Sequence, residues 1–428
     1  MITLKSDNLS FSFPEIGEEL HRLVEGHIQA TLPRLLAEDR DEVASTLKSQ
    51  WAFRNAKAEE RKKAEDKVLK ATPAQIEAAL RQKCMSQARL DRRDEFATVS
   101  VEFQRTLRIP DDGKVYPLPA GVGRFPLRHV DDYEKSVPES WLKRGGVMMP
   151  MHQSEALWLN FDAGYPFAMK VGAGKINAVT GEAWTAGLQR EPQNYLVLPE
   201  QPWLDGFVVS KGIIRQFVAM PLGDGYSVEE QLTGNADVGG IQLQVFPMKV
   251  EAYFRNELAD RMPTRLHDLL EELVGSWISD RGISRCLCAA APMLCEEAMG
   301  LGAGGTMRQE IYDDPHDFTD WNTAATSRCF IHLCNSLVWR QITGSNPPHP
   351  PLTAKEYAKS GIPWFDYYRD DLRAVDGSKI LGGVKSVAQL GKAKGTAPLP
   401  DNTTIAPELI VQYGNARRPD EVREWVEP

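Results

Sequence analysis

Between residues 98 and 250 the chain consists of short segments with strand character, and turn-forming residues separate them. The segments include "TVSVEF", "EALWLNF", "PFAMKV", "YLVLP", "IIRQFVAM" and "IQLQVFPM", and the turns include "DAG", "GAG", "SKG" and "GDG". Apolar runs bounded by glycine, proline and aspartate are typical of strands joined by tight turns. Parallel strands need helical crossovers, and most of these segments have no helical pattern between them. We therefore expect an antiparallel β-rich body, sandwich or barrel-like.

A helical stretch interrupts this strand-rich sequence near the N-terminus. Residues 9–13, "LSFSF", alternate apolar and polar side chains as a short strand does. The following residues instead place Leu20, Val24 and Ile28 at helical spacing, before strand character returns. The class that this pattern predicts is α+β, with a helical insertion at 15–97.

The rest of the chain is mixed. Helical spacing returns at 265–282, "RCFIHL" is strand-like, and the tail is rich in proline and glycine. The predicted organisation is a first strand of the β-rich body at 1–14, the helical insertion at 15–97, a β-rich domain at 98–252, a mixed α/β region at 253–344, and an irregular Pro/Gly-rich C-terminal segment at 345–428.

Charge and cysteine content exclude several classes. The formal net charge is −9 and the sequence pI is near 5.5, so no basic footprint for nucleic acid is expected. The longest apolar run, "CLCAAAPMLC" at 286–295, is about half of the ~20 residues that span a bilayer. The N-terminus lacks the pattern of a secretory signal. Six cysteines in 428 residues do not indicate a disulfide framework. We expect a cytoplasmic protein without membrane insertion.

"GAGK" at 172–175 resembles part of a phosphate-binding loop, but its surroundings favour a turn. A Walker A loop ends in GK followed by Ser or Thr, whereas Lys175 is followed by Ile176. The residues on both sides are strand-like, and glycine supplies the positive φ of a hairpin turn. We predict a hairpin with a solvated Lys175.

"GLGAGG" at 300–305 formally matches a dinucleotide-binding fingerprint. That fingerprint needs a strand before the glycines and a helix after them. Here an Ala- and Cys-rich, helix-like stretch precedes and a strand-like stretch follows. We interpret the glycines as the C-terminal stop of a helix and predict no cofactor.

Histidines near carboxylates offer the alternative hypothesis of an enzyme. A metal-dependent or carboxylate-based hydrolase would use His129, Asp131, His152, Glu155 and His332. No HExxH or zinc-finger spacing is present, and Cys286, Cys288 and Cys295 lack a second ligand pair. We therefore expect no metal, and satisfied structural histidines are favoured over catalytic ones.

Tryptophans in turn-like sequence are the remaining functional signal. Trp184 ("GEAWTAG") and Trp203 ("EQPWLDG") are candidate contacts for a ligand or a partner chain. The preferred hypothesis is a non-catalytic binding or assembly protein, in which the helical arm and these loops contact a protein partner or a second copy in a homo-oligomer. The sequence leaves the identity of any small-molecule ligand open.

Overall fold

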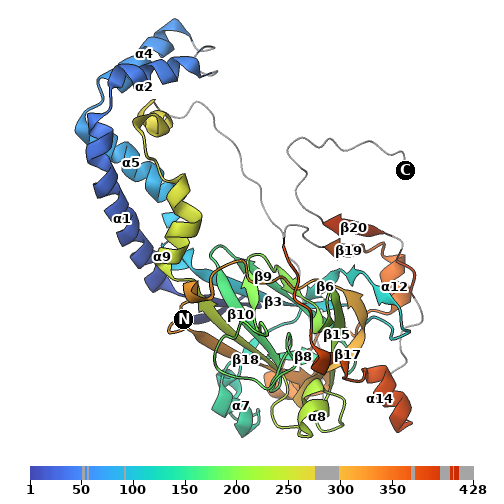
Figure 1. Ribbon diagram of the computed structural model, residues 1–428. Helices are drawn as coiled ribbons and strands as arrows, with labels where there is room; N and C mark the ends of the chain where they lie inside the picture. The colour runs from blue at the N-terminus through green and yellow to red at the C-terminus, as the bar shows by residue number, and fades with distance from the viewer. Residues whose placement is uncertain are drawn as a thin grey trace. The chain divides into compact units, whose positions relative to one another are not determined.

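A computed structural model describes residues 1–50, 54, 57–90, 93–274, 298–367, 372–395, 405–407 and 409–413 (Figure 1). The chain divides into two compact units. The first comprises Met1–Phe11, Val99–Pro247 and the part from Ala289 onward, and the second comprises Ser12–Thr98 and Met248–Cys288. The helical unit thus takes in a second segment, which the sequence analysis assigned to the mixed region.

The first unit is built on a large, mainly antiparallel sheet, which confirms the α+β class (Figure 1). Seventeen strands of the described residues form it: β1 Ile2–Lys5, β2 Asn8–Ser12, β3 Thr98–Thr106, β4 Val115–Tyr116, β6 Gly121–Arg124, β7 Arg128–His129, β8 Val147–Met151, β9 Ala156–Ala163, β10 Phe167–Ala173, β11 Ile176–Asn177, β12 Leu196–Leu198, β13 Trp203–Leu204, β14 Gly206–Ser210, β15 Ile213–Pro221, β16 Ile241–Pro247, β17 Ala298–Arg308 and β18 Ser327–Asn335.

Smaller elements complete this unit. A three-stranded sheet contains β5 Leu118–Pro119, β19 Trp364–Tyr367 and β20 Ile410–Tyr413. The helices are α7 Glu139–Arg144, α8 Val228–Thr233, α11 Ser336–Thr343, α12 Ala354–Lys359, α13 Lys379–Gly382 and α14 Val387–Lys394, with 3-10 turns at Asp131–Tyr133 and Phe318–Asp320.

The large sheet branches at β18. Through Ser327–Ile331 this strand pairs with β16, and through Leu333 and Cys334 it pairs with β17. One branch continues from β16 to β10 and β12, and the other from β17 to β15, β9 and β3. Apolar residues alternate along β3, where Val99, Val101 and Phe103 are buried, because one face of that strand meets the core.

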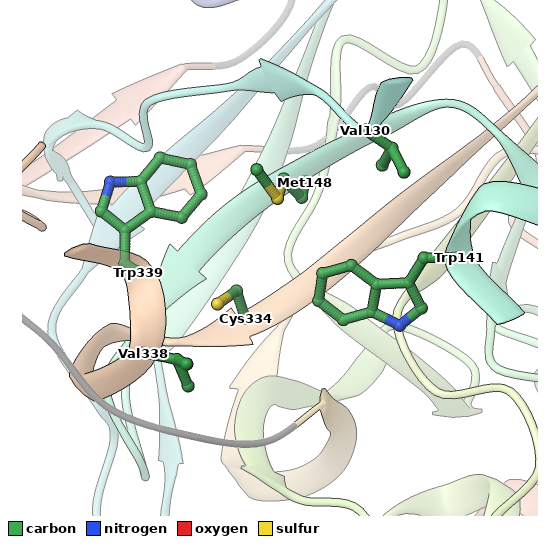
Figure 2. Packing of buried hydrophobic residues seen from close by; sticks show 6 residues of the cluster. All are labelled: Val130, Trp141, Met148, Cys334, Val338 and Trp339. Atoms are coloured by element: carbon green, nitrogen blue, oxygen red, sulfur yellow. The ribbon is translucent and has the colours of Figure 1, made fainter. Parts of the chain in front are cut away.

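A cluster of large side chains forms one part of the core (Figure 2). Trp141 comes from α7, Met148 from β8, Cys334 from β18, and Val338 and Trp339 from α11. The consecutive elements α7 and β8 are distant in sequence from the consecutive elements β18 and α11. Burial of apolar surface between them stabilises the unit by about 25 cal/mol per Å².

The second unit is helical. Its elements are α1 Pro14–Ala37, α2 Arg40–Ser49, α4 Ala58–Leu69, α5 Pro73–Gln87, α6 Arg93–Phe96, α9 Val250–Tyr253, a π-turn at Phe254–Leu258, 3-10 turns at Ala259–Arg261 and Leu266–Leu269, and α10 Leu270–Val274. Leu20, Val24 and Ile28 of α1 are fully buried, as their helical spacing predicts. Thr72 and Gln75 form a capping box at the start of α5. None of the helices in the described part of the chain has the length and apolar character that crossing a bilayer requires.

Candidate functional site

Two tryptophans and an asparagine form one wall of a pocket in the first unit. Trp158 and Asn160 are two residues apart on β9, so both side chains lie on the same face of the sheet. Trp203 of β13 is the cross-strand partner of Asn160. The rings of Trp158 and Trp203 meet edge to face, with centroids 6.4 Å apart and an interplanar angle of 68°. The two indoles therefore form a rigid aromatic corner.

The three-stranded sheet also contributes residues to the lining of the pocket. Leu118 of β5 pairs with Phe365 of β19, and both side chains line the pocket together with Pro119. The cavity measures about 360 Å³. Ligand pockets in proteins range from about 300 to 1,000 Å³, so this one suits a small molecule or a single side chain.

The polar group of the pocket is the carboxyl of Asp205, which follows β13 and is only 2% exposed. Its Oδ2 accepts a hydrogen bond from Nε2 of Gln309 at 3.0 Å, and its backbone N–H donates to Oε1 of the same side chain at 3.0 Å. Burial raises the pKa of Asp205 to about 8, although the hydrogen bond from Gln309 opposes this shift. The carboxyl of Asp205 is therefore uncharged at neutral pH.

Glycine allows the close packing around Trp158. A Cβ at Gly121 on β6 would lie 3.3 Å from Cζ2 of Trp158 and 3.1 Å from Oε1 of Gln104. The Nε1 of Trp158 is buried and has no hydrogen-bond partner among the described residues. Tight packing thus fixes the ring, while its polar atom is left without the bond that buried indoles usually make.

The two tryptophans that the sequence analysis selected lie in different surroundings. Trp203 lines the pocket. Trp184 covers Gly172 of β10, where a Cβ would lie 2.6 Å from Cε3 of the ring. Lys170 and Arg328 lie 4.8 and 5.4 Å from the Trp184 ring centroid as cation–π partners. Trp184 thus packs its loop onto the sheet, and Trp203 remains the candidate for a ligand contact.

Two of the three candidate histidines lie on opposite faces of the sheet. His332 pairs with Met148, whereas His129 pairs with the neighbouring residue Val147. Because successive residues of a strand point to opposite faces, the two imidazoles do not converge. His332 is buried and stacks on Trp141, with centroids 4.7 Å apart. Burial lowers its pKa to about 4, while its hydrogen bond to the Gly145 carbonyl opposes this. His129 is exposed.

His152 and Glu155 are joined through the backbone. The backbone N–H of His152 donates to Oε2 of Glu155 at 2.9 Å. The imidazole Nε2 of His152 lies 3.2 Å from the carbonyl oxygen of Pro348. The buried Glu155 also forms an ion pair with Arg105, whose Nε donates to Oε1 at 2.7 Å. Asp131 is exposed in a 3-10 turn. The structure therefore brings His152 and Glu155 together as a structural pair.

Of the two predictions about glycine motifs, the structure confirms one and contradicts the other. At "GAGK", β10 and β11 pair as a hairpin through Ala173 and Ile176, with Gly174 at φ +56°. The predicted hairpin is confirmed, and Lys175 forms an ion pair with Asp237 on the surface. At 300–305 the predicted helix stop is wrong, because the glycines lie within β17.

The acidic loop near residue 314 also has a structural role. Asp314 is buried and accepts hydrogen bonds from Tyr195 at 2.6 Å and from Nε1 of Trp321 at 2.8 Å. Cys286, Cys288 and Cys295 lie outside the described residues. In the described ranges no group of three or more His, Cys, Asp or Glu side chains is placed to hold a metal ion.

Sequence reasoning missed the remaining members of the pocket. Asp205 stands in "PWLDG", where aspartate before glycine is typical of a turn, and Phe365 comes from a distant part of the chain. Only the proximity of Asp205 to Trp203 in the sequence signals their association. Comparison with protein-family models, with curated proteins and with solved structures gave no match.

Proposed function

We propose that this protein is a non-catalytic binding protein that holds a small ligand between Trp158, Trp203 and Phe365. The observation that carries this proposal is the carboxyl of Asp205, buried at the wall of an otherwise aromatic and aliphatic pocket. Removing a carboxyl group from water is costly unless it gains partners. A ligand that bonds to Asp205 would add a second partner to the one that Gln309 supplies.

The aromatic walls supply the affinity. A Trp or Phe side chain offers about 150–250 Å² of surface, and aromatic contacts dominate many binding sites. Asn160 adds a carboxamide with both donor and acceptor groups on the same wall. A pocket with a few polar groups set among rigid rings is the usual form of a small-molecule site.

Binding is favoured over hydrolysis by the placement of the candidate catalytic groups. A nucleophile and its base must lie within hydrogen-bond reach of each other. His129 and His332 lie on opposite faces of the sheet, and Glu155 is engaged by Arg105. Asp205 has Gln309 as its side-chain partner, and an amide does not act as a base.

The helical unit is proposed as an assembly surface for a homo-oligomer or a protein partner. Exposed charged residues, among them Lys62 and Lys63, cover much of α4 and would keep such a surface soluble. The described cysteines Cys84, Cys329 and Cys334 are free thiols, which accords with a reducing compartment such as the cytoplasm. The net charge of −9 gives no support to nucleic-acid binding.

A fragment screen tests the binding function. Ligand-observed NMR with a library of small aromatic, amine and alcohol fragments should detect saturable binding to the wild-type protein. Trp203→Ala should abolish it, because this change removes one wall of the pocket. Trp184→Phe is the matched control, since it alters a tryptophan outside the pocket and should retain binding. A library without hits, or hits that Trp203→Ala leaves unchanged, would contradict the proposal.

A further inference from the structure

We infer that the pocket takes a small organic cation, namely an ammonium group bearing methyl or short alkyl substituents on a free small molecule. The juxtaposition that points to this ligand is Asp205 beside the rings of Trp158, Trp203 and Phe365. This inference rests on the proposed binding function and names its ligand class.

Asp205 gives the pocket one acidic group and no basic counterpart among the described lining residues. The charged side chains on the surrounding strands are Glu102, Arg105, Asp162, Arg215, Arg308 and Asp366. Four of these six form ion pairs that do not involve Asp205: Glu102 pairs with Arg124, Arg105 with Glu155, and Arg308 with Asp366. None of the six contributes to the pKa of Asp205, which burial and Gln309 determine. Among the described charged side chains of these strands, none therefore neutralises the carboxyl of Asp205.

The aromatic walls suit a substituted ammonium. A cation within about 6 Å of the centre of an indole or phenyl ring is attracted to the face of that ring, and cages of aromatic side chains commonly bind quaternary ammonium groups. Trp158, Trp203 and Phe365 come from three strands, so they can surround a ligand from several sides. Methyl groups on the nitrogen need no hydrogen-bond acceptors, and the aromatic walls offer none.

Other ligand classes fit less well. An anion would meet the carboxyl of Asp205 without a balancing base. A hard metal ion takes six or more oxygen ligands, and the described lining residues offer side-chain oxygens only from Asp205 and Asn160. A neutral apolar ligand would fill the pocket but would leave the carboxyl without a strong partner. The cation satisfies both the rings and the acid.

Cation binding must be coupled to proton release. In the empty pocket Asp205 is protonated below about pH 8, and an ammonium ligand favours the ionised form. The proton passes to solvent, so the bound pair is neutral overall. Between pH 6 and 7 the apparent affinity for a quaternary cation should rise about tenfold, because the ligand itself does not titrate.

Calorimetry with choline and its neutral isostere 3,3-dimethyl-1-butanol tests the inference. Choline should bind at least tenfold more tightly than the alcohol at pH 7, and its measured enthalpy should depend on the buffer because a proton is released. Asp205→Asn should weaken choline at least tenfold, remove the pH dependence and leave the alcohol unchanged. Asp162→Asn, which alters an exposed carboxyl on β9, is the matched control and should bind like the wild type.

The outcomes separate the inference from the proposed function. Equal binding of choline and the alcohol, both lost in Trp203→Ala, would overturn the cation and keep the binding pocket. No binding of either compound, together with an empty fragment screen, would overturn both. Tighter binding to phosphatidylcholine vesicles than to free choline would overturn the assignment to a free small molecule. Choline binding that survives Trp203→Leu would place the cation elsewhere and also overturn the inference.

Discussion

The side-chain amide of Gln309 contacts Asp205 twice, at the backbone and at the carboxyl. Its Oε1 accepts from the Asp205 N–H at 3.0 Å, and its Nε2 donates to Oδ2 at 3.0 Å. The same Nε2 lies 3.3 Å from the carbonyl of Trp203. Gln309 directly follows β17, so it ties the end of that strand to the segment that carries Trp203 and Asp205. Gln309, which does not itself line the pocket, thereby fixes the positions of two residues that do, Trp203 and Asp205.

Replacement of Gln309 should destabilise the protein. Gln309→Ala removes the partner of a buried N–H and of the Asp205 carboxyl, and an unsatisfied buried group costs about 1–3 kcal/mol. Urea unfolding should show a loss of that size. Gln189→Ala is the control, because this amide is exposed and should cost less than about 0.5 kcal/mol. Equal losses for the two variants would contradict the role of Gln309.

The pKa of Asp205 makes the stability of the empty protein depend on pH. Its ordinary value of 3.8 is raised to about 8, so the folded state binds the proton more tightly than the unfolded state between these values. The stability that this protonation contributes is fully present below about pH 4. It decreases as the pH rises and is lost above about pH 8. Asp205→Asn lacks this dependence.

Unfolding measurements at pH 5 and pH 9 therefore give a clear comparison. Between pH 5 and pH 9 the free energy of unfolding of the wild type should fall more than that of Asp205→Asn. The difference between the two changes should exceed about 1 kcal/mol, which corresponds to a pKa shift of about one unit. A difference that is constant with pH would show that the carboxyl is not held in the buried, neutral state.

His332 produces a dependence of the opposite sign. Burial lowers its pKa from 6.5 to about 4, so the unfolded state binds the proton more tightly between these values. The free energy of unfolding should therefore fall as the pH drops from 6.5 toward 4. Because each unit of pKa shift corresponds to about 1.36 kcal/mol, the loss should be up to about 3 kcal/mol. His332→Phe keeps a ring to stack on Trp141 and removes this titration. If acid destabilises both proteins equally, His332 is not the group responsible.

The hairpin at Gly174 and Lys175 gives a matched pair of substitutions. Lys175→Ala removes a surface ion pair with Asp237 and should cost less than about 1 kcal/mol. Gly174→Ala should cost more than about 1 kcal/mol, because the residue has φ +56° and a Cβ would lie 2.0 Å from Oε2 of the buried Glu229. Thermal unfolding should separate the two. ATP should stabilise neither protein, and a shift that Lys175→Ala abolishes would instead support phosphate binding.

Local sequence patterns predicted the parts of the fold that local chemistry determines. The capping box at Thr72 and the hairpin at Gly174 depend on residues within a few positions of each other. At Gly302 the contacts that require glycine come from residues distant in sequence. A Cβ there would lie 2.7 Å from Val387 and 2.9 Å from the carbonyl oxygen of Tyr226. Glycine permits β17 to pass these neighbours, but in the sequence it resembles a helix stop.

The pocket was only partly predictable for the same reason. The sequence indicates Trp203 because an aromatic residue in a turn-like segment is placed to contact a ligand or a partner chain. Asp205 resembled an ordinary turn aspartate, and its burial depends on pairing with β15 and on Gln309. Phe365 reaches the pocket through the pairing of β19 with β5, about 250 residues apart in sequence, and no local pattern reports such a contact.

The proposed assembly role of the helical unit gives the last prediction. The apolar stripe of α1 is buried inside this unit, so an assembly surface must use exposed residues such as Lys62 and Lys63 of α4. Replacing residues 17–95 by a Gly-Ser linker would also strip the partners of Met248–Val274, for example the contacts of Lys83 with Glu271 and Glu272. Charge reversal is therefore the cleaner test.

The double variant Lys62→Glu and Lys63→Glu should lower the mass in solution from a multiple of 47.8 kDa toward 47.8 kDa, and its free energy of unfolding should stay within about 0.5 kcal/mol of the wild type. The control reverses Lys355 and Lys359 of α12 and should leave the mass unchanged. A wild-type protein that is already monomeric, or a reversed variant that keeps the wild-type mass, would show that α4 is not the assembly surface.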